Sequence, residues 1–121
     1  MKKILLVDDM ESVRGLVAAT LEGGGYEVVQ AGDGDVALEI IKQQRDFALV
    51  ISDVNMPHRD GISLTAELRK LPDFKFVPIL LLTTESGRKK NMEGRAAGAT
   101  GWLVKPVDPK TFLNKIAKVL K

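Results

Sequence analysis

Residues 49–57 constrain this chain more than any other stretch, because an apolar, β-branched run leads straight into a carboxylate. Leu-Val-Ile-Ser precedes Asp53, and Asn-Met-Pro follows it. A run that is apolar throughout predicts a strand buried on both faces. Pro57 has no backbone N–H and cannot continue a central strand. We therefore predict a strand over residues 47–52 whose carboxyl end delivers Asp53 to an open surface.

Strands and helices are predicted to alternate along the whole sequence. Further strands are expected at residues 3–7, 26–31, 77–82 and 101–104, and helices at residues 10–22, 35–44 and about 87–97, after residue 61 and after residue 108. Met10 is the first of the apolar residues that recur at helical spacing in the first helix. The fourth helix has only Met92 and Ala96 as apolar anchors. Asp108 is the expected N-cap of the last helix, with Pro109 in its first turn.

This alternation predicts the fold class. Fully apolar strands joined by helices are typical of α/β proteins in which helices cover both faces of a parallel sheet. The sequence has 121 residues, an ordinary length for one domain. It contains no linker and no low-complexity tract. We therefore predict a single α/β domain over residues 1–121.

Composition argues against several classes of protein. There is no cysteine, which excludes disulfides and thiolate metal sites and suits a reducing cytoplasm. The longest apolar run, residues 77–82, is far too short to span a bilayer. The apolar stretch after Lys3 is too short for a signal peptide. We expect a cytoplasmic protein that does not interact with membranes.

Charge is distributed unevenly around a net value of +2. Residues 86–121 contain nine Lys and Arg against two Asp and Glu, a net charge of +7, which leaves −5 for residues 1–85. Solvated helix faces or a surface for a partner would each explain the basic third. Nucleic acid is a poor candidate for that partner, because aromatic residues are scarcely interleaved with the basic ones.

Polar residues whose side chains could take part in binding or catalysis follow four of the predicted strands. Asp8 and Asp9 follow the first strand, Asp53 the third, Thr83 the fourth and Lys105 the fifth. In an open α/β sheet, ligands bind beyond the carboxyl ends of the strands, where the strand order reverses. If the first and third strands are neighbours, three carboxylates converge there with a hydroxyl and an ammonium group beside them.

Three converging carboxylates call for a counterion. Two unit charges ~4 Å apart repel by roughly 4 kcal/mol at an effective dielectric near 20. A divalent cation removes this conflict, and ligands that are all oxygen favour Mg²⁺ over zinc. Such a site suits phosphoryl transfer. Asp53 is the candidate covalent acceptor, Lys105 offsets negative charge, and the Thr83 hydroxyl can donate a hydrogen bond to a phosphoryl oxygen.

At this point the sequence resembles a response-regulator receiver domain of the stand-alone chemotaxis (CheY-like) type. The resemblance covers the whole chain and rests on Val7-Asp8-Asp9, Asp53 with Asn55-Met56-Pro57 and Asp60-Gly61, Leu82-Thr83, and Gly98-Ala99 through Lys105-Pro106. It implies a doubly wound, flavodoxin-like (βα)5 fold with strand order 2-1-3-4-5. It also implies a phosphoacceptor signalling protein that is not an enzyme.

The resemblance assigns roles to individual residues. Asp53 would take a phosphoryl group from a phosphohistidine on a partner histidine kinase. Asp9 and Asp53 would bind Mg²⁺ directly, together with the backbone carbonyl of Asn55, and Asp8 largely through water. Lys105 would pair with the acceptor and then with the phosphoryl group. The peptide bond between Lys105 and the following proline is often cis in this family.

The resemblance also implies a switch. Thr83 would move toward the phosphoryl group and Trp102 would turn inward behind it, changing the face built from the fourth helix, fifth strand and fifth helix. Thr84 and Glu85 would flank the site. Trp102 is bulkier than the usual Tyr or Phe, Thr84 replaces a smaller residue, and Val107 replaces a common Phe.

The implied partners are a histidine kinase, a flagellar motor switch protein and, as a possibility, a phosphatase, with the chain acting as a monomer. A phosphate-sink or phosphorelay role would use the same site and stays open. A phosphohydrolase is disfavoured because its second Asp would lie two residues after the first-strand nucleophile, whereas Met10 follows Asp9. Nucleotide-binding glycine motifs are absent. Simpler interpretations also remain, namely Asp9 as the N-cap of the first helix and Trp102 as packing.

Overall fold

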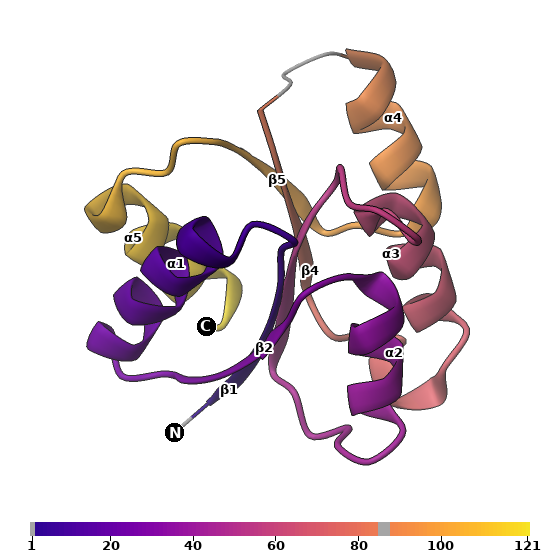
Figure 1. Ribbon diagram of the computed structural model, residues 1–121, viewed down its shortest axis with the longest axis horizontal. Helices are drawn as coiled ribbons and strands as arrows, with labels where there is room; N and C mark the ends of the chain where they lie inside the picture. Colours follow the sequence, from indigo (N-terminus) through magenta and orange to yellow (C-terminus); the bar gives the residue numbers. More distant parts are fainter. Residues whose placement is uncertain (1, 85–87) are drawn as a thin grey trace.

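Five parallel strands form one sheet in the order β2-β1-β3-β4-β5 (Figure 1). The strands are β1 (Lys3–Val7), β2 (Glu27–Ala31), β3 (Leu49–Asp53), β4 (Ile79–Thr83) and β5 (Gly101–Val104). This computed structural model describes residues 2–84 and 88–121. The predicted α/β class and the strand order 2-1-3-4-5 are confirmed. Because β1 lies between β2 and β3, the strand order reverses at β1 and β3, where the carboxylates were expected to meet.

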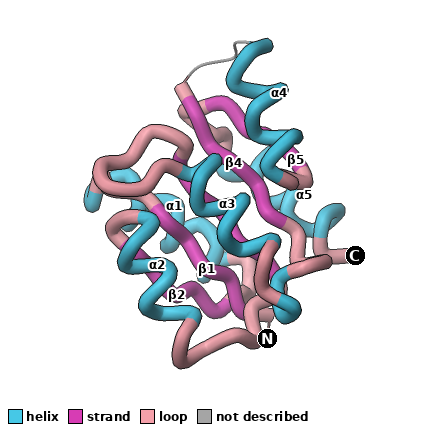
Figure 2. Tube along the Cα trace, turned by 90° about the vertical axis from the view of Figure 1, so that its right-hand side faces the viewer, coloured by secondary structure: helices cyan, strands magenta, loops and turns pink. Residues whose placement is uncertain are grey.

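Helices cover both faces of the sheet. They are α1 (Glu11–Gly23), α2 (Gly34–Ile41), α3 (Gly61–Arg69), α4 (Arg88–Ala97) and α5 (Pro109–Val119), with a short 3₁₀ helix η1 (Pro72–Phe74). Figure 1 shows α1 and α5 on one face of the sheet and α2, α3 and α4 on the other. In Figure 2 the second group faces the viewer. In the described part of the chain, no helix combines the length and apolar character needed to cross a membrane.

Alternate strand residues feed two separate cores. Ile4 and Leu6 of β1 pack with residues of α1 and α5, whereas Leu5 and Val7 pack with residues of α2 and α3. All four are fully buried. Successive side chains of a strand point to opposite faces, so a sheet covered on both faces needs apolar residues at every position. This explains why the strands lack an alternating apolar and polar pattern.

The start of α1 differs from the prediction. Asp9 is not its N-cap, because Met10 occupies that position and α1 begins at Glu11. The Oδ1 of Asp8 accepts a hydrogen bond from the Met10 N–H at 3.0 Å, so Asp8 orders the backbone before the helix begins. Met10 is also 54% exposed and does not belong to the buried face of α1. The predicted cap of α5 is confirmed, since Asp108 accepts from the Thr111 N–H at 3.0 Å.

The predicted anchors of α4 were wrong. Met92 is 63% exposed, and Ala96 is exposed as well. The buried residue among positions 92–97 is Gly94. A Cβ at Gly94 would lie 2.7 Å from Cζ3 of Trp102, so α4 approaches the sheet through its backbone at this point. Gly87, the predicted first residue of this helix, lies outside the described residues.

Arg69 joins three segments at the amino ends of β4 and β5. Its Nε donates to the Gly98 carbonyl at 2.9 Å, and its Nη1 donates to the carbonyls of Phe74 and Val77 at 2.7 and 2.6 Å. The guanidinium therefore satisfies carbonyl oxygens after α4, in η1 and before β4. Burial lowers the pKa of Arg69. Arg69 thus fixes the amino ends of β4 and β5, the two strands whose carboxyl ends position Thr83 and Lys105.

Arg69→Met is expected to reduce the free energy of unfolding by about 2–4 kcal/mol, because several partly buried carbonyls lose a charged donor. Chemical denaturation monitored by circular dichroism measures the change. Lys70→Met is the matched control: Lys70 makes only an exposed pair with Glu67, and its loss should change stability by less than about 0.5 kcal/mol. Equal effects of the two substitutions would contradict this role of Arg69.

Candidate functional site

The strands bring the predicted polar residues to one edge of the sheet. Asp53 is the last residue of β3 and lies opposite Leu82 of β4. Thr83 ends β4 and lies opposite Val104, the residue before Lys105. On the other side, Val7 lies opposite Ser52, so Asp8 continues from β1 beside Asp53. The carboxyl ends of β1, β3, β4 and β5 therefore assemble the site.

Lys105 bridges two of the carboxylates. Its Nζ lies 3.0 Å from Oδ2 of Asp8 and 3.2 Å from Oδ2 of Asp53. Asp8 is 1% exposed and Asp53 is 7% exposed, so both ion pairs are shielded from solvent. Shielding strengthens the attraction within each pair, but the cost of removing the charges from water opposes it. The bridge also ties β5 to β1 and β3, which are not its neighbours in the sheet.

Three carboxylates form the acidic cluster of the site. Asp8, Asp9 and Asp53 each offer an oxygen, and these atoms lie within 4.8 Å of one another. Asp9 is exposed, whereas the other two are buried. One ammonium group cannot balance three carboxylates. The donors are all oxygen, which fits a small divalent cation such as Mg²⁺ that keeps several waters.

The pKa values reflect this crowding. Burial raises the pKa of Asp53, the charge of Asp8 raises it further, and Lys105 opposes both. Burial lowers the pKa of Lys105, but its contacts with Asp8 and Asp53 outweigh burial, and its pKa is raised. The acidic cluster therefore favours the ammonium form of Lys105 and disfavours the carboxylate form of Asp53. A cation near Asp53 would relieve the second effect.

The loop after Asp53 packs directly behind the acceptor. The Ser52 hydroxyl donates to the Asp53 carbonyl at 2.9 Å, and the Gly61 N–H donates to the Val54 carbonyl at 2.9 Å. A Cβ at Gly61 would collide with the Asp53 carbonyl oxygen. Only glycine therefore allows α3 to start this close to the strand. The Asp60-Gly61 motif signalled this position, although the sequence did not reveal the contact itself.

The same loop is tied to α2 by pairs that the sequence did not reveal. Nδ1 of His58 lies 3.1 Å from Oδ2 of Asp33, and Nε of Arg59 lies 3.1 Å from Oδ1 of Asp35. His58 has a φ of 68°, a left-handed conformation that non-glycine residues rarely adopt. Neighbouring loops meet here without any periodic pattern, so the sequence gives no signal for these contacts.

The remaining predicted residues lie in or just after β3, β4 and β5. Thr83 is fully buried, Thr84 and Asn55 are exposed, and Trp102 is half-buried. The Lys105–Pro106 peptide bond is cis, as the resemblance implied. Glu85, predicted to flank the site, lies outside the described residues.

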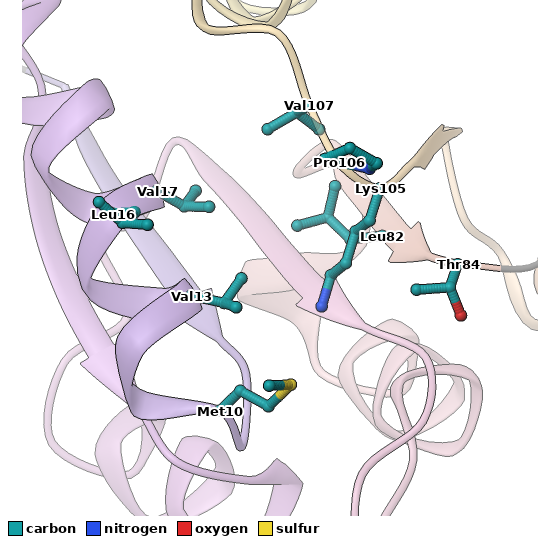
Figure 3. Close-up of a pocket in the computed structure, with 9 residues that line it drawn as sticks. All are labelled: Met10, Val13, Leu16, Val17, Leu82, Thr84, Lys105, Pro106 and Val107. Carbon is teal, nitrogen blue, oxygen red and sulfur yellow. The ribbon is translucent and has the colours of Figure 1, made fainter.

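An apolar groove that the sequence did not indicate borders Lys105. It encloses about 410 Å³ and runs between α1 and residues 105–107. Figure 3 shows Val13, Leu16 and Val17 of α1 on one side and Pro106 and Val107 on the other. This groove gives the site an apolar wall beside its charged centre.

Comparisons with known proteins agree with this geometry. A family model described as the response regulator receiver domain matches residues 4–117. The chain belongs to the response regulator receiver family. Receivers are signalling phosphoacceptor domains that take phosphate from histidine kinases, and they are generally not enzymes. This membership favours a receiver over the phosphohydrolase and nucleotide-binding alternatives.

Relatives include chemotaxis proteins and larger regulators. The chain is 37% identical to chemotaxis protein CheY-3 of Vibrio cholerae, covering 98% of the chain and 92% of that protein. The chain is also similar to a crystal structure of CheY4 of Vibrio cholerae, with a TM-score of 0.94 and 48% sequence identity. The match covers 98% of each chain. The probable transcriptional regulator ycf27 of Porphyridium aerugineum is 39% identical over 99% of the chain, but the chain spans only 48% of its length. Receivers similar to this chain therefore occur both as short chemotaxis proteins and within longer regulators.

Asp53→Asn is expected to make the metal-free receiver more stable at neutral pH. Because the pKa of Asp53 is raised on folding, the folded state favours its protonated form. The stability gained from that proton is fully present below the unfolded pKa and is lost as pH rises through the folded pKa. The advantage of the variant should therefore shrink as pH falls toward the unfolded value. Urea unfolding in a chelator, at neutral and acidic pH, measures both proteins; an equal difference at each pH would contradict the expectation.

Proposed function

We propose that this receiver is a stand-alone response regulator of bacterial chemotaxis, phosphorylated on Asp53 by a partner histidine kinase. The observation that carries the proposal is the buried Asp53 carboxylate held by Lys105 inside a cluster of three aspartates. The likeness to CheY4, which covers 98% of both chains, supports the chemotaxis role. In this proposal residues 1–121 act as one monomeric domain in the cytoplasm.

The transfer needs a nucleophile, charge neutralisation and a departing group. An Asp53 carboxylate oxygen attacks the phosphorus of a phosphohistidine, while the phosphorus–nitrogen bond breaks and its electron pair stays on the imidazole. Lys105 shifts its pairing from the carboxylate to the phosphoryl oxygens. Its raised pKa keeps it charged during this exchange.

Mg²⁺ is the proposed cofactor. Asp9, Asp53 and the backbone carbonyl of Asn55 would hold it directly, and Asp8 largely through water. When bound, Mg²⁺ supplies positive charge that stabilises the oxygens of the phosphoryl group. The support for this assignment is the all-oxygen cluster, whose three carboxylates exceed the charge of Lys105. Exposed Asp9 leaves the cluster open to a hydrated ion.

The output is a change in the face formed by α4, β5 and α5. Thr83 donates its hydroxyl to a phosphoryl oxygen, and Trp102 responds behind it, while Thr84 and Glu85 control access to Asp53. This face combines exposed apolar residues with basic ones. Among the residues of these elements whose exposure is described, the large exposed apolar ones are Met92 and Val104, and the exposed basic ones are Arg95, Lys110, Lys115 and Lys118. A protein segment with acidic and apolar residues would complement it, and a component of the flagellar motor switch is the proposed partner.

Phosphorylation is tested with acetyl phosphate and Mg²⁺, followed by intact mass. The wild-type receiver should gain one phosphoryl group, whereas Asp53→Asn, or a chelator, should abolish the gain. Asp73→Asn is the matched control, because Asp73 in η1 is an exposed carboxylate that pairs with Arg45. A phosphoryl group that still appears on Asp53→Asn would show that the acceptor lies elsewhere.

The chemotaxis role is tested separately in a flagellated bacterium that lacks its own chemotaxis regulator. Expression of the receiver should change the frequency of motor reversal, and Asp53→Asn should not. Normal phosphorylation without any motor effect would reject motor control. It would favour the phosphate-sink or relay role, which uses the same site.

A further inference from the structure

The contact between α4 and β5 is made where the helix has no side chain. Among residues 92–97 of α4, only Gly94 is buried. A Cβ built there would lie 2.7 Å from Cζ3 and 3.3 Å from Cε3 of Trp102, and 3.0 Å from Cδ1 of Leu81. The distance of 2.7 Å is shorter than the contacts that a Cβ atom makes in proteins. The six-membered ring of the indole therefore occupies the space that a side chain at position 94 would need.

Trp102 points toward α4 because of its position in the strand. It lies opposite Leu81 in the register of β4 and β5. Its neighbour Leu103 packs on the opposite face, against the core beneath α1 and α5. Successive side chains of a strand alternate between faces, so the indole lies on the face covered by α4. The ring thus lies between Leu81 of the sheet and Gly94 of the helix.

The inward position leaves one polar group unsatisfied. The Trp102 Nε1 is buried and has no hydrogen-bond partner among the described residues. A buried donor without an acceptor disfavours the conformation that contains it. The ring carbons must compensate through their packing against Gly94 and Leu81. Outward rotation would hydrate the N–H, so the balance between the two positions depends closely on this packing.

We propose that Gly94 is the positioning residue of the switch: its missing side chain is what allows Trp102 to lie inward beneath α4 before phosphorylation. Any larger residue at position 94 would drive the indole outward. Trp102 borders a hollow of about 430 Å³ lined by Arg95, Ala99, Thr100 and Gly101, which gives the ring open space on one side.

The inward indole adjoins the residues expected to sense phosphate. Leu81, which packs near the ring, is two residues before Thr83 on the same face of β4. Trp102 is two residues before Val104, which lies opposite Thr83. A displacement of Thr83 would therefore act on neighbours of the packed ring in both β4 and β5. This regulatory consequence rests on the proposed function, whereas the packing of Gly94 against the ring does not.

The test uses Trp102 as the only tryptophan of the chain. In the unphosphorylated receiver, Gly94→Ala should shift the fluorescence emission to longer wavelength and increase quenching by acrylamide. Gly15→Ala is the matched control, since a Cβ at this glycine in α1 meets nothing within 4 Å. It should leave both signals unchanged. A Gly94→Ala receiver that folds with unchanged emission and quenching would overturn the proposal.

A double-mutant cycle covers the case in which Gly94→Ala does not fold. Trp102→Phe removes the distal ring atoms that a Cβ at position 94 would meet. Gly94→Ala should therefore destabilise the wild-type receiver but cost much less in the Trp102→Phe background, as measured by urea unfolding. An equal loss in both backgrounds, or a double variant that stays unfolded, would show that the indole is not the obstacle and would reject the proposal.

Acetyl phosphate and Mg²⁺ separate this inference from the proposed function. In the wild-type receiver, phosphorylation should change the Trp102 signal. In Gly94→Ala, the mass gain at Asp53 should persist while the fluorescence change becomes smaller. A full fluorescence change in Gly94→Ala would reject the role of Gly94 in the switch. Failure of both proteins to gain a phosphoryl group would instead reject the proposed function and leave the packing result intact.

Discussion

A partly buried ammonium group shared by two carboxylates is the interaction on which the rest of this receiver depends. Lys105 follows β5, whereas Asp8 follows β1 and Asp53 ends β3. Its contacts with these two aspartates therefore link β5 to two strands that are not its neighbours in the sheet. Burying two carboxylates together would be strongly unfavourable without this partner. The pairing is also incomplete, because Asp9 adds a third negative charge. The residual charge makes the site receptive to cations while its shape stays fixed by the strands.

The fold and most of the site were predictable because they follow from strand ends. Four of the five apolar runs lead into a polar residue, and parallel strands bring those residues to the same edge. The strand Gly101–Val104 was therefore predicted with its observed bounds. Boundaries set by local hydrogen bonds were less accessible. Met10 was assigned to the buried face of α1 because it is apolar, but its N–H is held by Asp8 and its side chain is exposed.

The features that the sequence could not reveal are those carried by absent side chains or by loop contacts. Hydrophobic periodicity searches for apolar side chains, so it selected Met92 and missed Gly94, whose contribution to packing is the space it leaves. The pairs that join the loop after Asp53 to α2 connect residues in separate irregular segments. The apolar groove beside Lys105 likewise depends on how α1 faces residues 105–107. Such arrangements exist only once the elements have been placed.

The two edges of the sheet are held by chemically different acceptors. At the carboxyl ends, aspartates hold Lys105, and both sides of that pairing carry a charge that protons and cations can change. At the amino ends of β4 and β5, Arg69 is held by backbone carbonyls, which do not titrate and carry no formal charge. A change in ion or proton concentration can therefore alter the pairing of Lys105 without changing the acceptors that hold Arg69. The contacts of Arg69 thus hold the amino ends of β4 and β5 independently of the charges that hold the residues at their carboxyl ends.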